Sequence, residues 1–183
     1  MLSNRKNGIL MHISSVPGNT GIGTLGKNSY RFVDFLKETK QTYWQILPVG
    51  PTSYGDSPYQ SFSTFAGNPY FIDLEILAEE GWLSKEDYES VNWGHPNYID
   101  YGLIYVERHK IFQKLQDNFE KKPCPEFSTF CEENKFWLED YALFMAVKNK
   151  YDSKSYYEWD EDIRLRKESA ISSYKKKYAK DVE

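Results

Sequence analysis

Aromatic and polar side chains gather at residues 54–70 in a combination that suits a sugar. This stretch holds three tyrosines, two phenylalanines, one acid and several hydroxyl and amide groups, and two prolines and two glycines shape its backbone. Aromatic rings can pack against the apolar C–H faces of a sugar, while neighbouring polar groups bond to its hydroxyls. The composition therefore predicts a carbohydrate-binding loop.

The elements around this loop indicate where it would lie in a fold. Residues 8–15 form a near-continuous apolar run, which is typical of a strand covered on both faces in a parallel sheet. Residues 28–40 have the spacing of an amphipathic helix, and residues 43–49 predict a second buried strand. This order predicts a βαβ unit with parallel strands. Enzymes of the α/β class carry their chemistry in loops that follow such strands. The loop at 54–70 follows the second predicted strand and so has this position.

The sequence after residue 73 is helical in pattern. Apolar spacing predicts helices at residues 74–80, 101–121, 136–150 and 164–180, with a further turn or two at 126–133. Two strands are too few for an independent sheet. We therefore expect an α/β fold in which the chain supplies the N-terminal part of a (β/α)8 TIM barrel with a mostly helical insertion.

This reading predicts two parts within an incomplete N-terminal fragment of a longer protein. Residues 1–73 would form the first βαβ unit of the barrel with the substrate-cleft loop, and residues 74–183 would form a helical insertion or subdomain.

Composition and charge exclude several other classes of function. A net charge of −4 over 183 residues gives no electrostatic footprint for nucleic acid. No apolar run approaches the roughly 20 residues that span a bilayer, and the N-terminus lacks the apolar core of a signal peptide. Cys124 and Cys131 form no metal or redox motif, and the three histidines are scattered. We expect a cytoplasmic protein with reduced thiols, no metal and no cofactor.

A glycine motif offers a competing hypothesis. Residues 21–26 read G-x-G-x-x-G between a predicted strand and a predicted helix, as in a dinucleotide-binding site. The first glycine stands too far from the end of the strand, however, and the second strand is not followed by the expected acid until Asp56. The simpler interpretation is that these glycines let a loop fold tightly over the strand ends.

Two polar residues have alternative interpretations. Asp56 could orient a sugar hydroxyl, but its place beside Pro58 favours a role in capping a turn. His12 lies on a predicted core strand, which favours a structural histidine over a general base.

The sequence blocks, in their order along the chain, resemble about the N-terminal third of the 4-α-glucanotransferases of glycoside hydrolase family 77. These enzymes are also called amylomaltases or disproportionating enzymes. The resemblance is dense over residues 8–81, whereas residues 85–135 and 152–183 share only helical character. The matching blocks are GILMHISS at 8–15, PG at 17–18, GIG at 21–23, LG at 25–26, FVDFL at 32–36, WQILP at 44–48, GPT at 50–52, GDSPYQ at 55–60, FAGNPY at 65–70, IDL at 72–74 and YALFMA at 141–146.

The resemblance implies a retaining transglycosylase. Such an enzyme cuts an α-1,4 bond in a maltooligosaccharide and passes the glucan to the 4-hydroxyl of an acceptor sugar. The reaction needs two carboxyl groups about 5 Å apart, one as nucleophile and one as acid/base. In the family these groups come from later barrel strands, so we assign no catalytic residue in this chain and expect it to be inactive alone.

The resemblance does assign part of a substrate cleft. Tyr59 matches a tyrosine that lies against the sugar next to the scissile bond, and Ser57 matches a neighbouring substrate contact. Tyr54 matches an aromatic residue that some members use at a second glucan site. The alternative for Tyr59 and Tyr70 is that their rings merely pack the loop, and for Tyr70 this alternative is favoured.

A second class of function also stays open at this point. The chain could be a non-catalytic glucan-binding fragment or remnant, with affinity for maltooligosaccharides and no transfer activity. The small number of predicted strands disfavours such an independent module.

Overall fold

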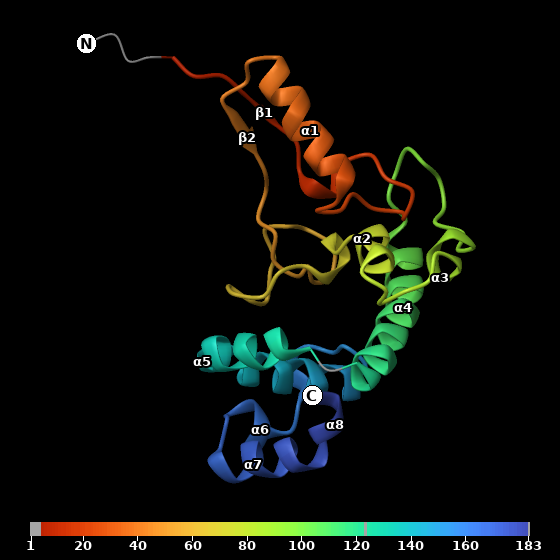
Figure 1. The fold of residues 1–183 in the computed structure, drawn as a ribbon. Helices are drawn as coiled ribbons and strands as arrows, with labels where there is room; N and C mark the ends of the chain where they lie inside the picture. Colours follow the sequence, from red (N-terminus) through yellow and green to blue (C-terminus); the bar gives the residue numbers. More distant parts are fainter. Residues whose placement is uncertain (1–4, 123, 183) are drawn as a thin grey trace. The chain divides into compact units, whose positions relative to one another are not determined.

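The computed structural model describes residues 5–122 and 124–182. The chain divides into two compact units, the first at residues 1–123 and the second at 124–183. Figure 1 shows helices as the main elements of both units. The boundary at 73/74 that we expected concerned barrel and insertion in a longer protein, and it stays a prediction.

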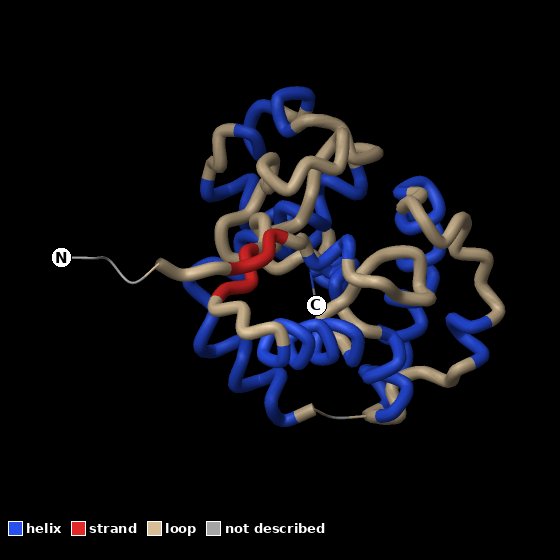
Figure 2. The backbone as a smooth tube through the Cα atoms, turned by 90° about the horizontal axis from the view of Figure 1, so that it is seen from above, coloured by secondary structure: helices blue, strands red, loops and turns tan. Residues whose placement is uncertain are grey.

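The N-terminal βαβ unit is present. Strand β1 (Gly8–Leu10) pairs in parallel with strand β2 (Tyr43–Gln45), and helix α1 (Lys27–Glu38) connects them. Gly8 lies opposite Tyr43 in this register. Figure 2 shows the two strands side by side. The predicted parallel pairing is therefore confirmed.

The strands are shorter than the predicted ranges 8–15 and 43–49, and the reason is local. The N–H of Met11 donates to the carbonyl of Gln45 at 3.0 Å, which extends the ladder by one bond. The N–H of Leu47 instead donates to Nδ1 of His12, and Pro48 has no N–H to offer. The chain then turns into the 3₁₀-helix η1 (Ile13–Ser15).

In this chain by itself neither strand is covered on both faces, and the expected covering by further elements of a barrel stays a prediction. In each strand the outer two residues are exposed and only the middle one is half-buried. Leu10, for example, exposes 59% of its surface.

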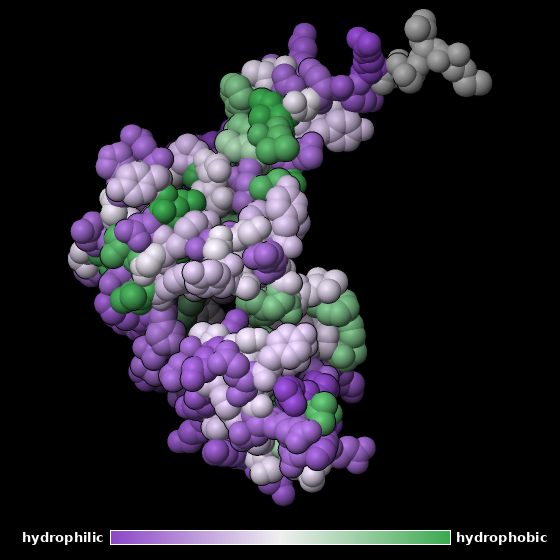
Figure 3. All heavy atoms as spheres, turned by 180° about the vertical axis from the view of Figure 1, so that it is seen from behind, coloured by the Kyte–Doolittle hydropathy of each residue, from purple (hydrophilic) through white to green (hydrophobic). Residues whose placement is uncertain are grey.

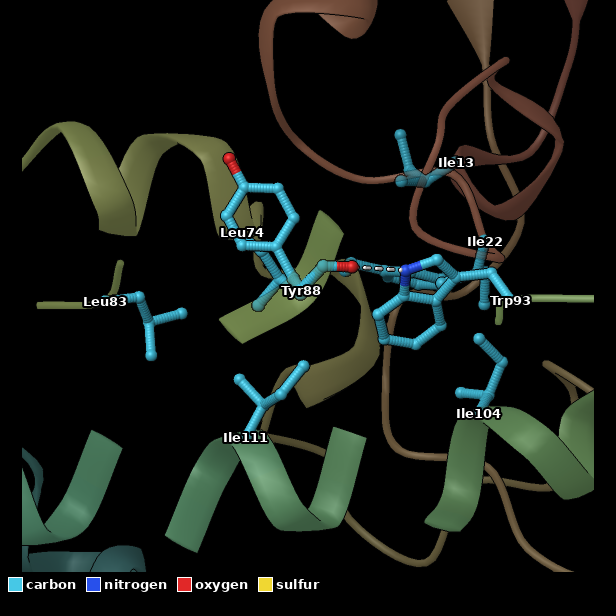
Figure 4. Packing of buried hydrophobic residues seen from close by; sticks show 9 residues of the cluster. Ile13, Ile22, Leu74, Leu83, Tyr88, Trp93, Ile104 and Ile111 are labelled. Atoms are coloured by element: carbon cyan, nitrogen blue, oxygen red, sulfur yellow. Dashed lines mark hydrogen bonds between the residues drawn. The ribbon is translucent and has the colours of Figure 1, made fainter. Parts of the chain in front are cut away.

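The core of the first unit lies between helix α4 and the short helices and loops around it. The 3₁₀-helix η2 (Pro69–Phe71), α2 (Leu74–Glu79) and α3 (Glu86–Glu89) precede α4 (Tyr101–Lys121). Figure 4 shows Ile104 and Ile111 of α4 pointing toward the other buried side chains. The cluster consists of Ile13, Ile22, Phe71, Leu74, Leu83, Tyr88, Trp93, Ile104 and Ile111.

The second unit has its own small core. It contains α5 (Pro125–Lys150), the 3₁₀-helix η3 (Tyr156–Glu158), α6 (Glu161–Arg164), α7 (Glu168–Lys177) and α8 (Ala179–Val182). Its buried side chains are Leu143, Val147, Trp159, Ile163 and Ala170.

The helix bounds in this unit differ from the predicted ones. The segments expected at 126–133 and 136–150 form one continuous helix, α5. The helix expected at 164–180 is divided at two places. Arg166 adopts a left-handed φ of 56° between α6 and α7, and α7 ends at Lys177 before α8 begins at Ala179.

No helix within 5–122 or 124–182 is long and apolar enough to cross a membrane. No group of three or more His, Cys, Asp or Glu side chains among the same residues could hold a metal ion.

Candidate functional site

The predicted binding residues lie on the long loop between β2 and η2. Tyr54 exposes 98% of its surface and Tyr59 exposes 72%, so both rings face solvent. Ser57 is half-buried, and its Oγ accepts a hydrogen bond from the N–H of Tyr59 at 3.3 Å. The ring of Tyr59 thus does not pack the interior of the loop in this chain, and it is available to a ligand.

Hydrogen bonds within the loop hold its backbone in shape. Two turns close through bonds from the Asp56 N–H to the Ser53 carbonyl and from the Gln60 N–H to the Ser57 carbonyl, each 3.0 Å long. The N–H of Asn68 donates to the carbonyl of Val49 at 2.8 Å and joins the two ends of the loop. The exposed rings therefore stand on an ordered backbone.

The side chain of Asp56 does not have the predicted role of capping a turn. Its backbone closes a turn with a left-handed φ of 55°, but its Oδ1 is buried and has no hydrogen-bond partner within the described part of the chain. Burial raises the pKa of this carboxyl group. An unpaired acceptor beside Ser57 could bind a sugar hydroxyl, the interpretation that the sequence disfavoured.

Two tyrosines lie close enough to Asp56 to be affected by its charge. The pKa of Tyr70 and that of Tyr101 are raised, mainly by burial and further by the charge of Asp56. Tyr101 belongs to α4, far along the sequence from the loop. No signal in the loop itself could have indicated this environment.

Tyr70 is a packing residue, as the sequence favoured. Its half-buried ring lies 5.6 Å from the ring of Tyr105 and 6.4 Å from that of Phe112. These contacts fix the end of the loop to α4.

His12 has the surroundings of a structural residue. It is buried, its ring meets that of Phe71 edge-on at 5.3 Å, and its Nδ1 accepts from the N–H of Leu47 at 3.3 Å. Burial lowers the pKa of His12. The imidazole therefore serves to join the ends of the two strands.

The G-x-G-x-x-G segment packs against protein groups. A Cβ atom at Gly26 would lie 1.8 Å from Oδ2 of Asp73, so that carboxylate occupies the space beside the N-terminus of α1. The hydroxyl of Thr24 donates to the same oxygen at 2.5 Å. A pyrophosphate would need this position, and the arrangement therefore speaks against dinucleotide binding.

A buried arginine joins α4 to the loops of the strand region. Arg108 is fully buried, and its guanidinium donates to the carbonyl of Ile72 at 3.0 Å and to the hydroxyl of Thr20 at 3.2 Å. Burial lowers its pKa to about 10. No pattern in the sequence marks Arg108 as a buried residue, because its burial depends on segments distant in sequence.

Comparison with known proteins gives consistent matches along the chain. The family described as 4-alpha-glucanotransferase matches residues 11–183. A 4-alpha-glucanotransferase of Clostridium butyricum is 54% identical over 173 residues, which cover 94% of this chain and 36% of that protein. A 4-alpha-glucanotransferase of Streptococcus pneumoniae is 50% identical over 181 residues, with 97% and 36% covered.

A solved structure is similar in fold as well. Amylomaltase from Streptococcus agalactiae in complex with acarbose superposes with a TM-score of 0.92 at 44% identity, over 98% of this chain and 37% of that one. The chain thus spans little more than a third of the length of these relatives.

Proposed function

The chain belongs to the 4-alpha-glucanotransferase family, and from this membership we propose that it is the N-terminal segment of such an enzyme. The complete enzyme transfers an α-1,4-glucan from one maltooligosaccharide to the 4-hydroxyl of an acceptor sugar. It does so by a retaining double displacement. The carboxyl groups that react belong to the part of the protein beyond residue 183, and this segment alone is inactive.

The fold supports a place in a barrel. β1 and β2 are parallel neighbours joined through a helix, as the first two strands of a (β/α)8 barrel would be. Their exposed side chains leave room for further strands and helices. In this proposal the remaining two thirds of the enzyme close the barrel.

The observation that carries the proposal is an ordered loop with exposed rings at the C-terminal end of β2. Tyr59 would stack on the sugar next to the scissile bond, with Ser57 as a polar contact beside it. Tyr54, the most exposed ring of the loop, would serve a second glucan site. The similar amylomaltase is in complex with acarbose, a glucan analogue, which favours maltooligosaccharides as substrates here. We further propose that the protein is cytoplasmic and needs no cofactor.

A chimeric enzyme tests this proposal. We would replace the matching 36% of the Clostridium butyricum relative with this chain and measure glucose release and chain elongation from maltotriose. The chimera is expected to be active, and Tyr59→Ala to lower transfer about tenfold to a hundredfold, because a misplaced reacting sugar loses rate steeply.

Tyr157→Ala is the matched control, since Tyr157 exposes 68% of its surface in the second unit. Equal rates in the two variants would refute the role of Tyr59. A folded chimera that binds maltoheptaose but transfers nothing would favour the non-catalytic glucan-binding alternative.

A further inference from the structure

The second unit contains a pocket that the proposed function does not use. Its volume is about 250 Å³, and it is lined by residues of α5, η3, α6, α7 and the turns between them. All of these residues belong to the unit at 124–183, so the pocket is formed within one compact part of the chain. A ligand of this pocket would be small, because drug-sized molecules occupy pockets of about 300–1,000 Å³.

Most of the lining is apolar. The apolar side chains at the pocket include those of Leu143, Phe144, Val147, Ile163 and Ile171, of which three are buried and two half-buried. A sugar would find few partners for its hydroxyl groups among such side chains. An inorganic anion would leave the apolar walls without contacts. The lining therefore suits a ligand with an apolar body.

The lining also contains three charged side chains, and one of them is unpaired. Nη2 of Arg166 donates to Oδ2 of Asp140 at 2.7 Å, so these two charges offset each other. Arg164 is half-buried, and its Nη1 donates to the carbonyl of Tyr157 at 3.3 Å. Within residues 5–122 and 124–182, Arg164 forms no ion pair. The other N–H groups of its guanidinium can therefore bind an anionic group of a ligand.

A buried tryptophan adds a second donor without a partner. Trp159 lines the pocket and exposes only 8% of its surface. Its ring lies 5.3 Å from that of Phe144, and its Nε1 has no hydrogen-bond partner in the described part of the chain. A buried N–H without an acceptor is unfavourable. A ligand that brings an oxygen acceptor into the pocket would offer it a partner.

We propose that this pocket binds a small carboxylate that carries an apolar group. The carboxylate would bind to Arg164, and the apolar group would fill the space between α5 and α7. The combination of an apolar lining with an unpaired guanidinium carries the proposal. Guanidinium and carboxylate groups form strong charge-assisted hydrogen bonds, and burial of the apolar group adds affinity. The proposal does not rest on the glucan-transfer function.

Titration of the full chain with phenylpropionate, followed by ¹H–¹⁵N NMR, tests the proposal. The indole N–H signal of Trp159, identified by its loss in Trp159→Phe, is expected to shift until the site is saturated. Phenylpropanol has the same apolar body without the charge, and propionate has the charge with little apolar body. Each is expected to bind about tenfold more weakly than phenylpropionate, because each lacks one of the two contacts.

Arg164→Gln removes the charge that the proposal requires. It is expected to weaken the binding of phenylpropionate about tenfold and to leave that of phenylpropanol unchanged. Lys154→Gln is the matched control, because Lys154 is an exposed cation of the same unit outside the pocket. It should bind phenylpropionate as the parent chain does.

Three results would overturn the proposal. Equal affinities of the parent chain for phenylpropionate and phenylpropanol would refute a site for carboxylates, whether or not any variant folds. An unchanged affinity for phenylpropionate in a folded Arg164→Gln variant would refute the role of the guanidinium. A folded parent chain in which phenylpropionate leaves the Trp159 signal unmoved would refute the site itself.

Discussion

At the scale of single residues, His12 replaces a backbone group in the pairing of the strands. Its Nδ1 accepts from the N–H of Leu47, which requires an unprotonated Nδ1. The proton of the neutral ring then resides on Nε2. Protonation of Nδ1 would remove this bond and place a charge in a buried position.

The pKa of His12 should consequently lie below its ordinary value of about 6.5, because burial disfavours the charged form. The unfolded chain then binds the proton at higher pH than the folded one. The contribution to stability is complete above about pH 6.5 and is lost as the pH falls toward the folded pKa. An NMR titration of the His12 ring gives the pKa directly, and a value at or above 6.5 would contradict this account.

The titration of Asp56 should affect stability in the direction opposite to that of His12. Burial raises the pKa of its carboxyl group, so the folded chain binds the proton more tightly than the unfolded one. Stability is therefore lost as the pH rises from about 3.8 through the folded pKa.

We expect Asp56→Asn to be more stable than the parent chain at pH 7 and nearly equal to it below about pH 3.8. Urea denaturation at the two pH values measures this difference. Asp34→Asn, at an exposed position of α1, is the control and should change little at either pH. A destabilised Asp56→Asn variant at pH 7 would show that the carboxylate has a favourable partner after all.

At the scale of elements, the sequence predicted helices better than strands. The predicted helix 101–121 has the bounds of α4, because apolar spacing repeats along its whole length. The predicted strand ends failed because the ladder stops at the side chain of His12, which no periodicity reveals. The predicted break in the helix between residues 133 and 136 is absent, because nothing in that stretch breaks a helix.

The candidate site was predictable from the sequence only in part. The loop of Tyr54, Ser57 and Tyr59 follows from composition and from its place after a strand. The surroundings of Asp56 do not, because they depend on Tyr101 of α4, which tertiary packing brings near the loop.

The packing of α1 against the segment before α2 can be tested at one glycine. Gly26 has a φ of −117°, which any residue can adopt, so its need for glycine is steric alone. An added Cβ would clash with the Asp73 carboxylate, which is itself held by the hydroxyl of Thr24 and the N–H of Ile76. The carboxylate cannot move aside without breaking these bonds.

Gly26→Ala is therefore expected to destabilise the chain by about 1–3 kcal/mol. Gly67→Ala is the matched control, because a Cβ there meets no atom within 4 Å and the change stiffens the unfolded chain. Urea denaturation of both variants makes the comparison. Equal stabilities would mean that the contact between Gly26 and Asp73 is not maintained in solution.

At the scale of the whole molecule, the first unit exposes apolar side chains where a parallel sheet would normally be covered. Figure 3 shows apolar side chains at the surface of the part that contains the strands and α1. The exposed apolar residues of this part include Leu10, Val33, Phe35, Tyr43 and Ile46. If the chain is one segment of a barrel, the remaining segments should cover the strand positions.

Leu10 allows this to be tested by one substitution in two settings. In the chain alone, Leu10→Asp should change the free energy of unfolding by less than about 0.5 kcal/mol, because the side chain is already exposed. In the chimera with the Clostridium butyricum relative, the same change should lower the free energy of unfolding several-fold more than in the chain alone. It should also lower activity, because it would bury a charge in a covered sheet. Leu10→Met keeps an apolar side chain and should be tolerated in both settings. Urea denaturation measures each case, and an Asp variant that is equally harmless in the chimera would mean that this face of β1 stays open in the complete enzyme.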